Sequence, residues 1–166
     1  MMEKLTSAFK VGDKAVHASH GIGEVTSIER REISGQKQRF YILQILDSGM
    51  TVMVPTESAS SRGLRTIIGR GEIQKVFSVL RLQTGAVPKQ TWNRRHRAYL
   101  DKLNSGSLLQ VAEVVRELSR LRGHKNLSFS ERRLLENARS MVVRELALAR
   151  HIAEAKVEKE LDAIFG

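Results

Sequence analysis

The residues of this sequence best suited to chemistry are a single tryptophan and the arginines around it, in the segment TWNRRHRAYLDKL at positions 91–103. Helical spacing places four residues of this segment on one face: Trp92, His96, Tyr99 and Leu103. The same spacing spreads three cations around the sides of that helix: Arg94, Arg95 and Arg97. The segment therefore combines an aromatic ring with several groups that bind phosphate.

Trp92 falls in the first turn of this helix, after Thr91 as its cap, so that no preceding turn covers the ring. Apolar side chains that enter a base step, flanked by Arg or Lys on the phosphates, recur in proteins that distort DNA. We therefore predict that Trp92 is a wedge and that four cations contact phosphates: Arg94, Arg95, Arg97 and Lys102. The alternative is that Trp92 is a core residue and that the arginines form a solvated helix face.

Other kinds of chemistry find no support in the sequence. The chain has no cysteine, which excludes disulfides, thiolate zinc sites and cysteine nucleophiles. His17 and His20 offer two imidazoles without a third ligand, and we interpret them as a surface pair. The glycine pairs at positions 21/23 and 69/71 lack the third glycine of a dinucleotide fingerprint. We expect no enzymatic activity, cofactor, metal or small-molecule substrate.

The net charge of +10 and the pI near 10.4 predict a polyanionic partner, most commonly nucleic acid. Residues 1–66 carry nine Lys and Arg against seven Asp and Glu, whereas residues 67–166 carry nineteen against eleven. We therefore expect the second part of the 166-residue chain to meet the polyanion. No apolar run approaches the roughly 20 residues of a membrane span, and the amino-terminal residues Met-Met-Glu-Lys lack the apolar core of a signal peptide, so we expect a cytoplasmic protein.

Short period-two segments separated by turn signals predict a small, strongly bent five-stranded sheet or open barrel in the first 68 residues. The turns are expected at His20-Gly21-Ile22-Gly23, Ser34-Gly35 and Asp47-Ser48-Gly49. Pro55 cannot donate a ladder hydrogen bond, which favours an edge position for the strand Met50 to Pro55. Such an edge accepts a strand from another chain, unless the carboxy-terminal helices cover it.

Helical periodicity begins after Gly69 and Gly71, and it predicts about five helices in residues 69–166. Capping boxes are expected at Ser107 to Gln110 and at Ser128 to Glu131. The expected fold class is therefore α+β, with a β domain over residues 1–68 and an all-α domain over residues 69–166. The last strand is expected at Leu64 to Ile68.

Four collinear segments resemble the CarD/CdnL family of bacterial transcription regulators: FKVGDKAV from Phe9, WNRRHR from Trp92, AEVVREL from Ala112 and SERRLLENAR from Ser130. The resemblance implies a Tudor-like, SH3-like first domain that binds the beta subunit of RNA polymerase by pairing at a strand edge. It also implies that Arg31 is a contact cation and that the contact strand includes Val52, Met53, Val54 and Pro55. Some relatives have a basic residue where this sequence has Met53.

The resemblance further implies how the helical domain acts within a polymerase holoenzyme that carries the housekeeping sigma factor. Trp92 would contact promoter DNA at the upstream edge of the minus-ten element, without sequence specificity, and stabilise the open complex. The protein would then be associated with the nucleoid through the polymerase. An alternative function is a self-sufficient architectural DNA-binding protein, whose sheet domain serves only for dimerisation.

Overall fold

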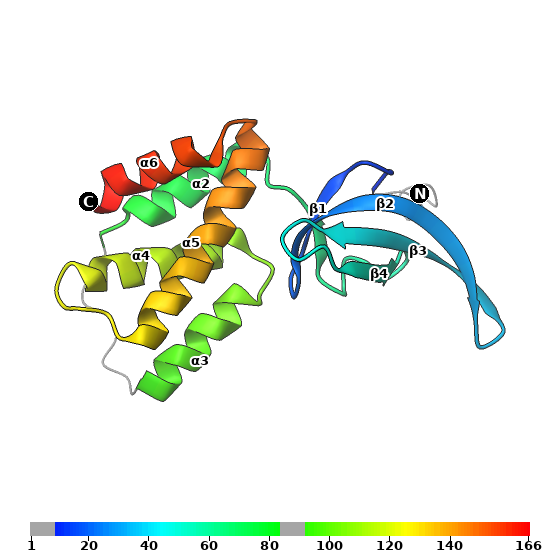
Figure 1. Ribbon diagram of the computed structural model, residues 1–166, viewed down its shortest axis with the longest axis horizontal. Helices are drawn as coiled ribbons and strands as arrows, with labels where there is room; N and C mark the ends of the chain where they lie inside the picture. Colours follow the sequence, from blue (N-terminus) through cyan, green and yellow to red (C-terminus); the bar gives the residue numbers. More distant parts are fainter. Residues whose placement is uncertain (1–8, 84–91) are drawn as a thin grey trace. The chain divides into compact units, whose positions relative to one another are not determined.

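The computed structural model describes residues 9–83 and 92–166, and it divides into two compact units, Met1–Ile67 and Ile68–Gly166. Within the described residues, a five-stranded antiparallel sheet is followed by five helices (Figure 1). This arrangement confirms the α+β class expected from the sequence. The expected Thr91 cap lies outside the described residues.

The first unit is built from five strands: β1 (Lys14–His17), β2 (Gly21–Ile33), β3 (Gln36–Ile45), β4 (Thr51–Pro55) and β5 (Leu64–Thr66). Their order in the sheet is β4-β3-β2-β1-β5, so that β4 and β5 are the edges. Side chains from several strands and from the flanking loops form its core: Phe9, Ala15, Val25, Tyr41, Leu43, Val54, Ala59 and Leu64. The edge position predicted for the Pro55 strand is thereby confirmed.

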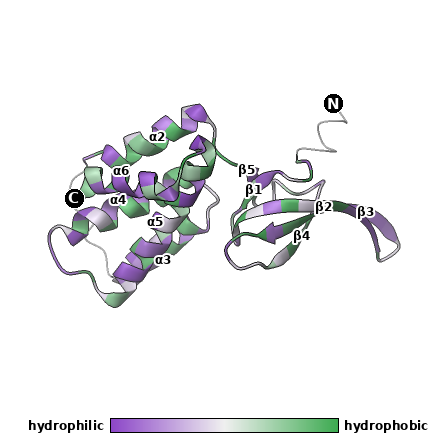
Figure 2. Cartoon of the chain, turned by 45° about the horizontal axis from the view of Figure 1, so that its top comes forward, coloured by the Kyte–Doolittle hydropathy of each residue, from purple (hydrophilic) through white to green (hydrophobic). Residues whose placement is uncertain are grey.

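The β2–β3 hairpin is the longest paired region of this sheet. Its two strands pair from Gly23↔Ile45 to Ile33↔Gln36, whereas β4 pairs only beside the second half of β3, and the hairpin projects beyond it (Figure 1). The hairpin closes through the predicted Ser34-Gly35 turn, with φ of 54° and 80°, as a type I′ turn requires. Figure 2 shows hydrophilic residues at this projecting end.

Two local predictions for this unit are wrong. The turn expected over His20 to Gly23 lies at residues 18–20 instead, because Gly21 already pairs with His17 at the start of β2. The last strand ends at Thr66 rather than at Ile68. The side chain of Ile68 belongs to the helical core, and its N–H donates to the buried Glu145 carboxylate at 2.9 Å.

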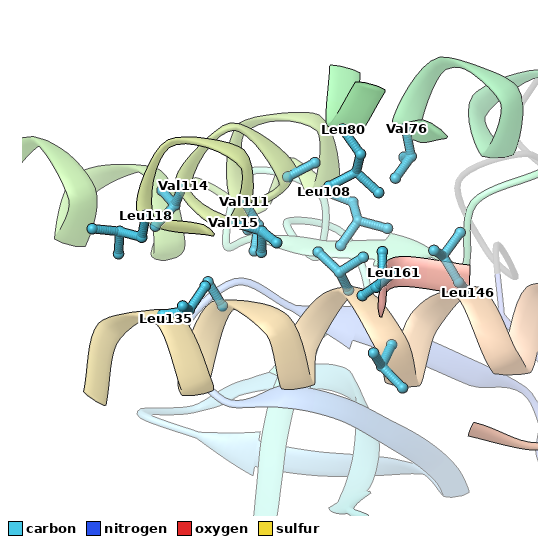
Figure 3. Packing of buried hydrophobic residues seen from close by; sticks show 14 of the residues in the cluster. Val76, Leu80, Leu108, Val111, Val114, Val115, Leu118, Leu135, Leu146 and Leu161 are labelled. Carbon is cyan, nitrogen blue, oxygen red and sulfur yellow. The ribbon is translucent and has the colours of Figure 1, made fainter. Parts of the chain in front are cut away.

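The second unit contains α2 (Arg70–Arg81), α3 (Trp92–Leu103), α4 (Leu108–Arg122), α5 (Phe129–Arg150) and α6 (Glu154–Phe165). Helix α4 packs against α2, α3 and α5, and α6 packs against α5. Figure 3 shows the apolar side chains that meet between them, among them Val76, Leu80, Leu108, Val111, Val115, Leu118, Leu135, Leu146 and Leu161. Burial of these side chains holds the helices together.

The helix starts show which capping predictions hold. At α5 the Ser128 side chain accepts from the Glu131 N–H, and the Glu131 carboxylate accepts from the Ser128 N–H, so the predicted capping box is confirmed. At α4 the Ser107 side chain accepts from the Gln110 N–H, but the structure gives no reciprocal bond from Gln110. No helix in the described part of the chain is long and apolar enough to span a membrane.

Candidate nucleic-acid interface and sheet edge

Trp92 is the first residue of α3, and its side chain is half-buried against the helical core. Its ring lies 5.2 Å from the His96 ring, one turn further along the same helix. The guanidinium carbon of Arg95 lies 5.1 Å from the centre of the Trp92 ring, within the range of a cation–π contact. Trp92 is therefore neither a fully buried core residue nor a freely projecting ring.

Arg95, which was predicted to contact phosphate together with Arg94 and Arg97, is turned into the protein. Its Nη2 donates to Glu131 Oε2 at 3.1 Å, and the two side chains are only 17% and 3% exposed. The same guanidinium lies between two aromatic rings, because its carbon is also 6.0 Å from the centre of the Tyr99 ring. Arg95 thus connects the aromatic face of α3 to the start of α5.

Glu131 is the centre of this connection. Besides closing the capping box, its Oε1 lies 3.1 Å from Lys125 Nζ, in the segment between α4 and α5. Burial alone would raise the pKa of Glu131, but the Ser128 N–H and the charges of Lys125 and Arg95 outweigh burial and lower that pKa. The sequence pointed to Glu131 only as a cap, because its contact with Arg95 joins residues far apart in the chain.

Lys102 is also engaged within the helical unit. Its Nζ lies 3.0 Å from Glu113 and 3.8 Å from Glu117, both on α4. The Tyr99 hydroxyl donates to the same Glu117 at 3.3 Å, and burial together with the Glu117 charge raises the pKa of Tyr99. Lys102 and Tyr99 therefore fasten α3 to α4, and the Lys102 charge is largely compensated inside the protein.

Arg94 and Arg97 are the predicted phosphate contacts whose side chains lie on the exposed surface of α3. They are three positions apart in the helix, which places them beside each other, about one turn apart. Asn93 and Ala98 are exposed on the same side of α3. The outer face of α3 thus presents two neighbouring cations, on the helix that begins with the half-buried Trp92.

The edge strand β4 alternates between exposed and buried side chains. Met53 is 39% exposed, whereas Val54 is 2% exposed and lies in the core of the sheet. Val52 packs partly buried against that core. The two valines therefore hold β4 on the sheet, and Met53 is the apolar side chain that β4 offers to a partner.

The hydrogen-bonding direction of β4 follows from its two ends. The Met50 carbonyl accepts from the Ile45 N–H at 2.8 Å, and the Thr56 N–H donates to the Arg39 carbonyl at 3.0 Å. Along an antiparallel strand, the backbone N–H and C=O groups of successive residues point alternately toward and away from the neighbouring strand. The backbone groups of Val52 and Val54 therefore also bond to β3, and those of the residues between them point away from β3. Thr51, Met53 and Pro55 therefore present their backbone groups at the free edge of the sheet.

Pro55 fits this pattern because a residue that faces outward loses no bond to β3. Arg31, the expected contact cation, lies on β2 and is exposed, with its Nη2 2.8 Å from the Glu29 carboxylate. The hydrogen bond from Arg31 is the main cause of the lowered pKa of Glu29. A partner that uses Arg31 must therefore compete with Glu29.

The side chains of His17 and His20 lie together, with ring centres 4.7 Å apart. Burial and the neighbouring His20 lower the pKa of His17. Among the described residues, no three His, Cys, Asp or Glu side chains are grouped as metal ligands.

Comparison with known proteins connects both regions to one family. The family model of the CarD-like/TRCF RID domain matches residues 9–68, and that of the CarD C-terminal domain matches residues 75–162. A Bacillus subtilis (strain 168) protein named "Putative transcription factor YdeB" is 31% identical over 151 residues, which are 90% of this chain and 97% of that protein.

Two solved structures from Myxococcus xanthus are similar to part of this chain. The match to CdnLNt is 49% identical in sequence and covers 39% of this chain and 92% of the CdnLNt chain, with a TM-score of 0.33. The match to the 72-residue N-terminal domain of CarD is 33% identical in sequence and covers 35% of this chain and 77% of the CarD domain chain, with a TM-score of 0.31.

Proposed function

The chain belongs to the CarD family, and we propose that it is a transcription regulator that docks on RNA polymerase and stabilises the open promoter complex. The first unit binds the polymerase beta subunit, and the helical unit contacts promoter DNA at the upstream edge of the minus-ten element. The holoenzyme with the housekeeping sigma factor selects the promoter, since cations on phosphates position a protein without reading sequence.

The free edge of β4 supports the docking step. Thr51, Met53 and Pro55 direct their backbone groups away from the sheet, and an extended segment of the beta subunit can pair with them. The exposed Met53 side chain adds an apolar contact. Arg31 on β2 can add a polar contact. The self-sufficient DNA-binding alternative assigns no polymerase partner to this edge.

The arrangement of α3 is the single observation that carries the DNA-binding step. Arg94 and Arg97 lie exposed on the same helix as Trp92, whose ring is in contact with the Arg95 guanidinium. We assign phosphate contacts to Arg94 and Arg97, whereas Arg95 and Lys102 hold the helix in place through their carboxylate partners. Trp92 enters the edge of the opened duplex and slows its closing.

Permanganate footprinting of thymines around the minus-ten element tests the proposal at a fixed polymerase concentration. We expect the wild-type protein to raise thymine reactivity, and Met53→Asp or Trp92→Ala to raise it less. Equal reactivity with and without the wild-type protein contradicts open-complex stabilisation. If only Trp92→Ala matches the wild type, docking stands and the wedge role is rejected.

A further inference from the structure

An open groove of about 950 Å³ lies on the first unit, between the β2–β3 hairpin and the end of β4. It is lined by Arg30, Gln36, Lys37, Gln38, Arg39, Pro55, Thr56, Glu57, Ser58 and Arg62. Four of these residues are cations and one is a carboxylate, although residues 1–66 as a whole are nearly neutral. The groove therefore concentrates positive charge in a unit that otherwise has little.

The register of the hairpin places two of these cations directly opposite each other, Arg30 on β2 and Arg39 on β3. Like charges in such a pair destabilise a sheet. Within residues 9–83 and 92–166, neither guanidinium has an ion pair or a hydrogen bond to relieve the repulsion. By contrast, the opposed residues Lys14 and Glu24 of the same sheet form an ion pair of 3.4 Å.

We propose that this groove binds an acidic, extended segment of the polymerase, next to the strand that pairs with β4. The inference rests on the docking proposed above and names the chemistry of that partner. Pro55, the last outward-facing residue of β4, and Thr56 after it line the groove, so a paired strand continues directly into it. Carboxylates of that segment relieve the repulsion between Arg30 and Arg39.

The lining favours a peptide over a nucleic acid. None of its ten residues is aromatic, so it offers no platform on which bases stack. The groove receives an extended chain more readily than the convex surface of a duplex. Four polar side chains of the lining can form hydrogen bonds to peptide groups: Gln36, Gln38, Thr56 and Ser58. The Arg62 Nε donates a hydrogen bond to Ser58 Oγ at 2.9 Å, which orients the Arg62 guanidinium.

The test uses the full chain with Arg39→Gln, and Lys10→Gln as a control that removes one exposed cation from the same unit. Affinity for purified RNA polymerase core enzyme is measured by biolayer interferometry at several salt concentrations. We expect Arg39→Gln to bind roughly tenfold more weakly and with a shallower salt dependence, because it loses a charge-assisted contact. The control keeps wild-type affinity.

Thermal unfolding separates binding from a structural role. Removing one of two opposed like charges relieves repulsion, so Arg39→Gln should melt at the wild-type temperature or above it at low salt. Arg30→Gln should behave in the same way and provides a second variant. Weaker binding together with a lowered melting temperature in both variants assigns the arginines to the fold and overturns the proposal.

Two further outcomes are distinguishable. If Arg39→Gln keeps wild-type affinity while Met53→Asp binds weakly, the groove proposal is rejected and the docking edge stands. If neither variant changes affinity, both the groove and the edge are rejected as polymerase contacts. An equal loss of affinity for a free oligonucleotide in Arg39→Gln shows a nucleic-acid ligand and overturns the acidic-peptide assignment.

Discussion

Arg95 and Glu131 form an ion pair of 3.1 Å that joins α3 to the start of α5, and the Arg95 guanidinium carbon lies 5.1 Å from the centre of the Trp92 ring. Both side chains are largely removed from solvent, so the pair cannot be treated as a weak surface contact. The position of the ring therefore depends on a carboxylate in another helix. Because the chain has one tryptophan, its fluorescence reports on that position.

Glu131→Gln should destabilise the helical unit by roughly 3 kcal/mol, because it leaves the buried Arg95 charge without its carboxylate. Glutamine keeps the size of the side chain and much of the cap. Urea unfolding measures the loss, and a change in tryptophan emission should accompany it under native conditions. Glu136→Gln, on the exposed side of α5, serves as the control and should leave both unchanged. Unchanged emission in Glu131→Gln contradicts the dependence of Trp92 on this ion pair.

The lowered pKa of Glu131 predicts the direction of a pH effect. A carboxyl whose folded pKa lies below its usual 4.5 stabilises the fold above that pH, and this contribution is lost as pH falls through the folded pKa. The difference in unfolding free energy between wild type and Glu131→Gln should therefore shrink between pH 6 and pH 3. Urea titrations across this range measure it, and a constant difference rules out the ionised carboxylate as the cause.

Arg94→Gln and Arg97→Gln should each weaken binding to duplex DNA of any sequence. Each lost phosphate contact should reduce the logarithmic salt slope by about 0.9. Titration of labelled duplexes across salt concentrations measures the slope, with Lys159→Gln on the exposed surface of α6 as the control. Slopes equal to that of the wild type in both variants reject the outer face of α3 as a phosphate contact.

Met53→Asp should reduce the affinity for RNA polymerase by at least roughly tenfold, since an unpaired carboxylate against partner backbone costs several kcal/mol to desolvate. Its side chain is exposed, so the sheet should remain folded. Leu46→Asp, at an exposed position outside β4, is the matched control. Val54→Asp should instead unfold the sheet, because Val54 is buried. Wild-type affinity of Met53→Asp places the polymerase contact elsewhere.

Local patterns were sufficient to predict the sheet, the helices and the edge position of β4. Period-two and helical spacing indicate which face of an element is buried, and Pro55 and Ser34-Gly35 carry their own backbone constraints. The capping box at Ser128 could likewise be predicted from residues three positions apart. These features depend on neighbours in the chain.

The partners of the cations could not be predicted in this way. Arg95 and Glu131 are 36 residues apart, and Lys102 meets carboxylates of the following helix. Helical spacing placed Arg94, Arg95 and Arg97 around one helix, but packing of α3 on its neighbours decides which of them is buried. The opposition of Arg30 and Arg39 likewise follows from the strand register.

The lifetime of the open promoter complex after a heparin challenge tests the central claim most directly. Trp92→Ala should lower stability by about 2 kcal/mol, less than the roughly 3 to 5 of a fully buried tryptophan, because Trp92 is only half-buried. The protein should therefore remain folded, which circular dichroism verifies. We expect the wild type to prolong the lifetime and Trp92→Ala to shorten it roughly five- to hundredfold relative to wild type, since a stacked ring contributes about 1 to 3 kcal/mol. A folded Trp92→Ala protein that prolongs the open complex as the wild type does contradicts the wedge.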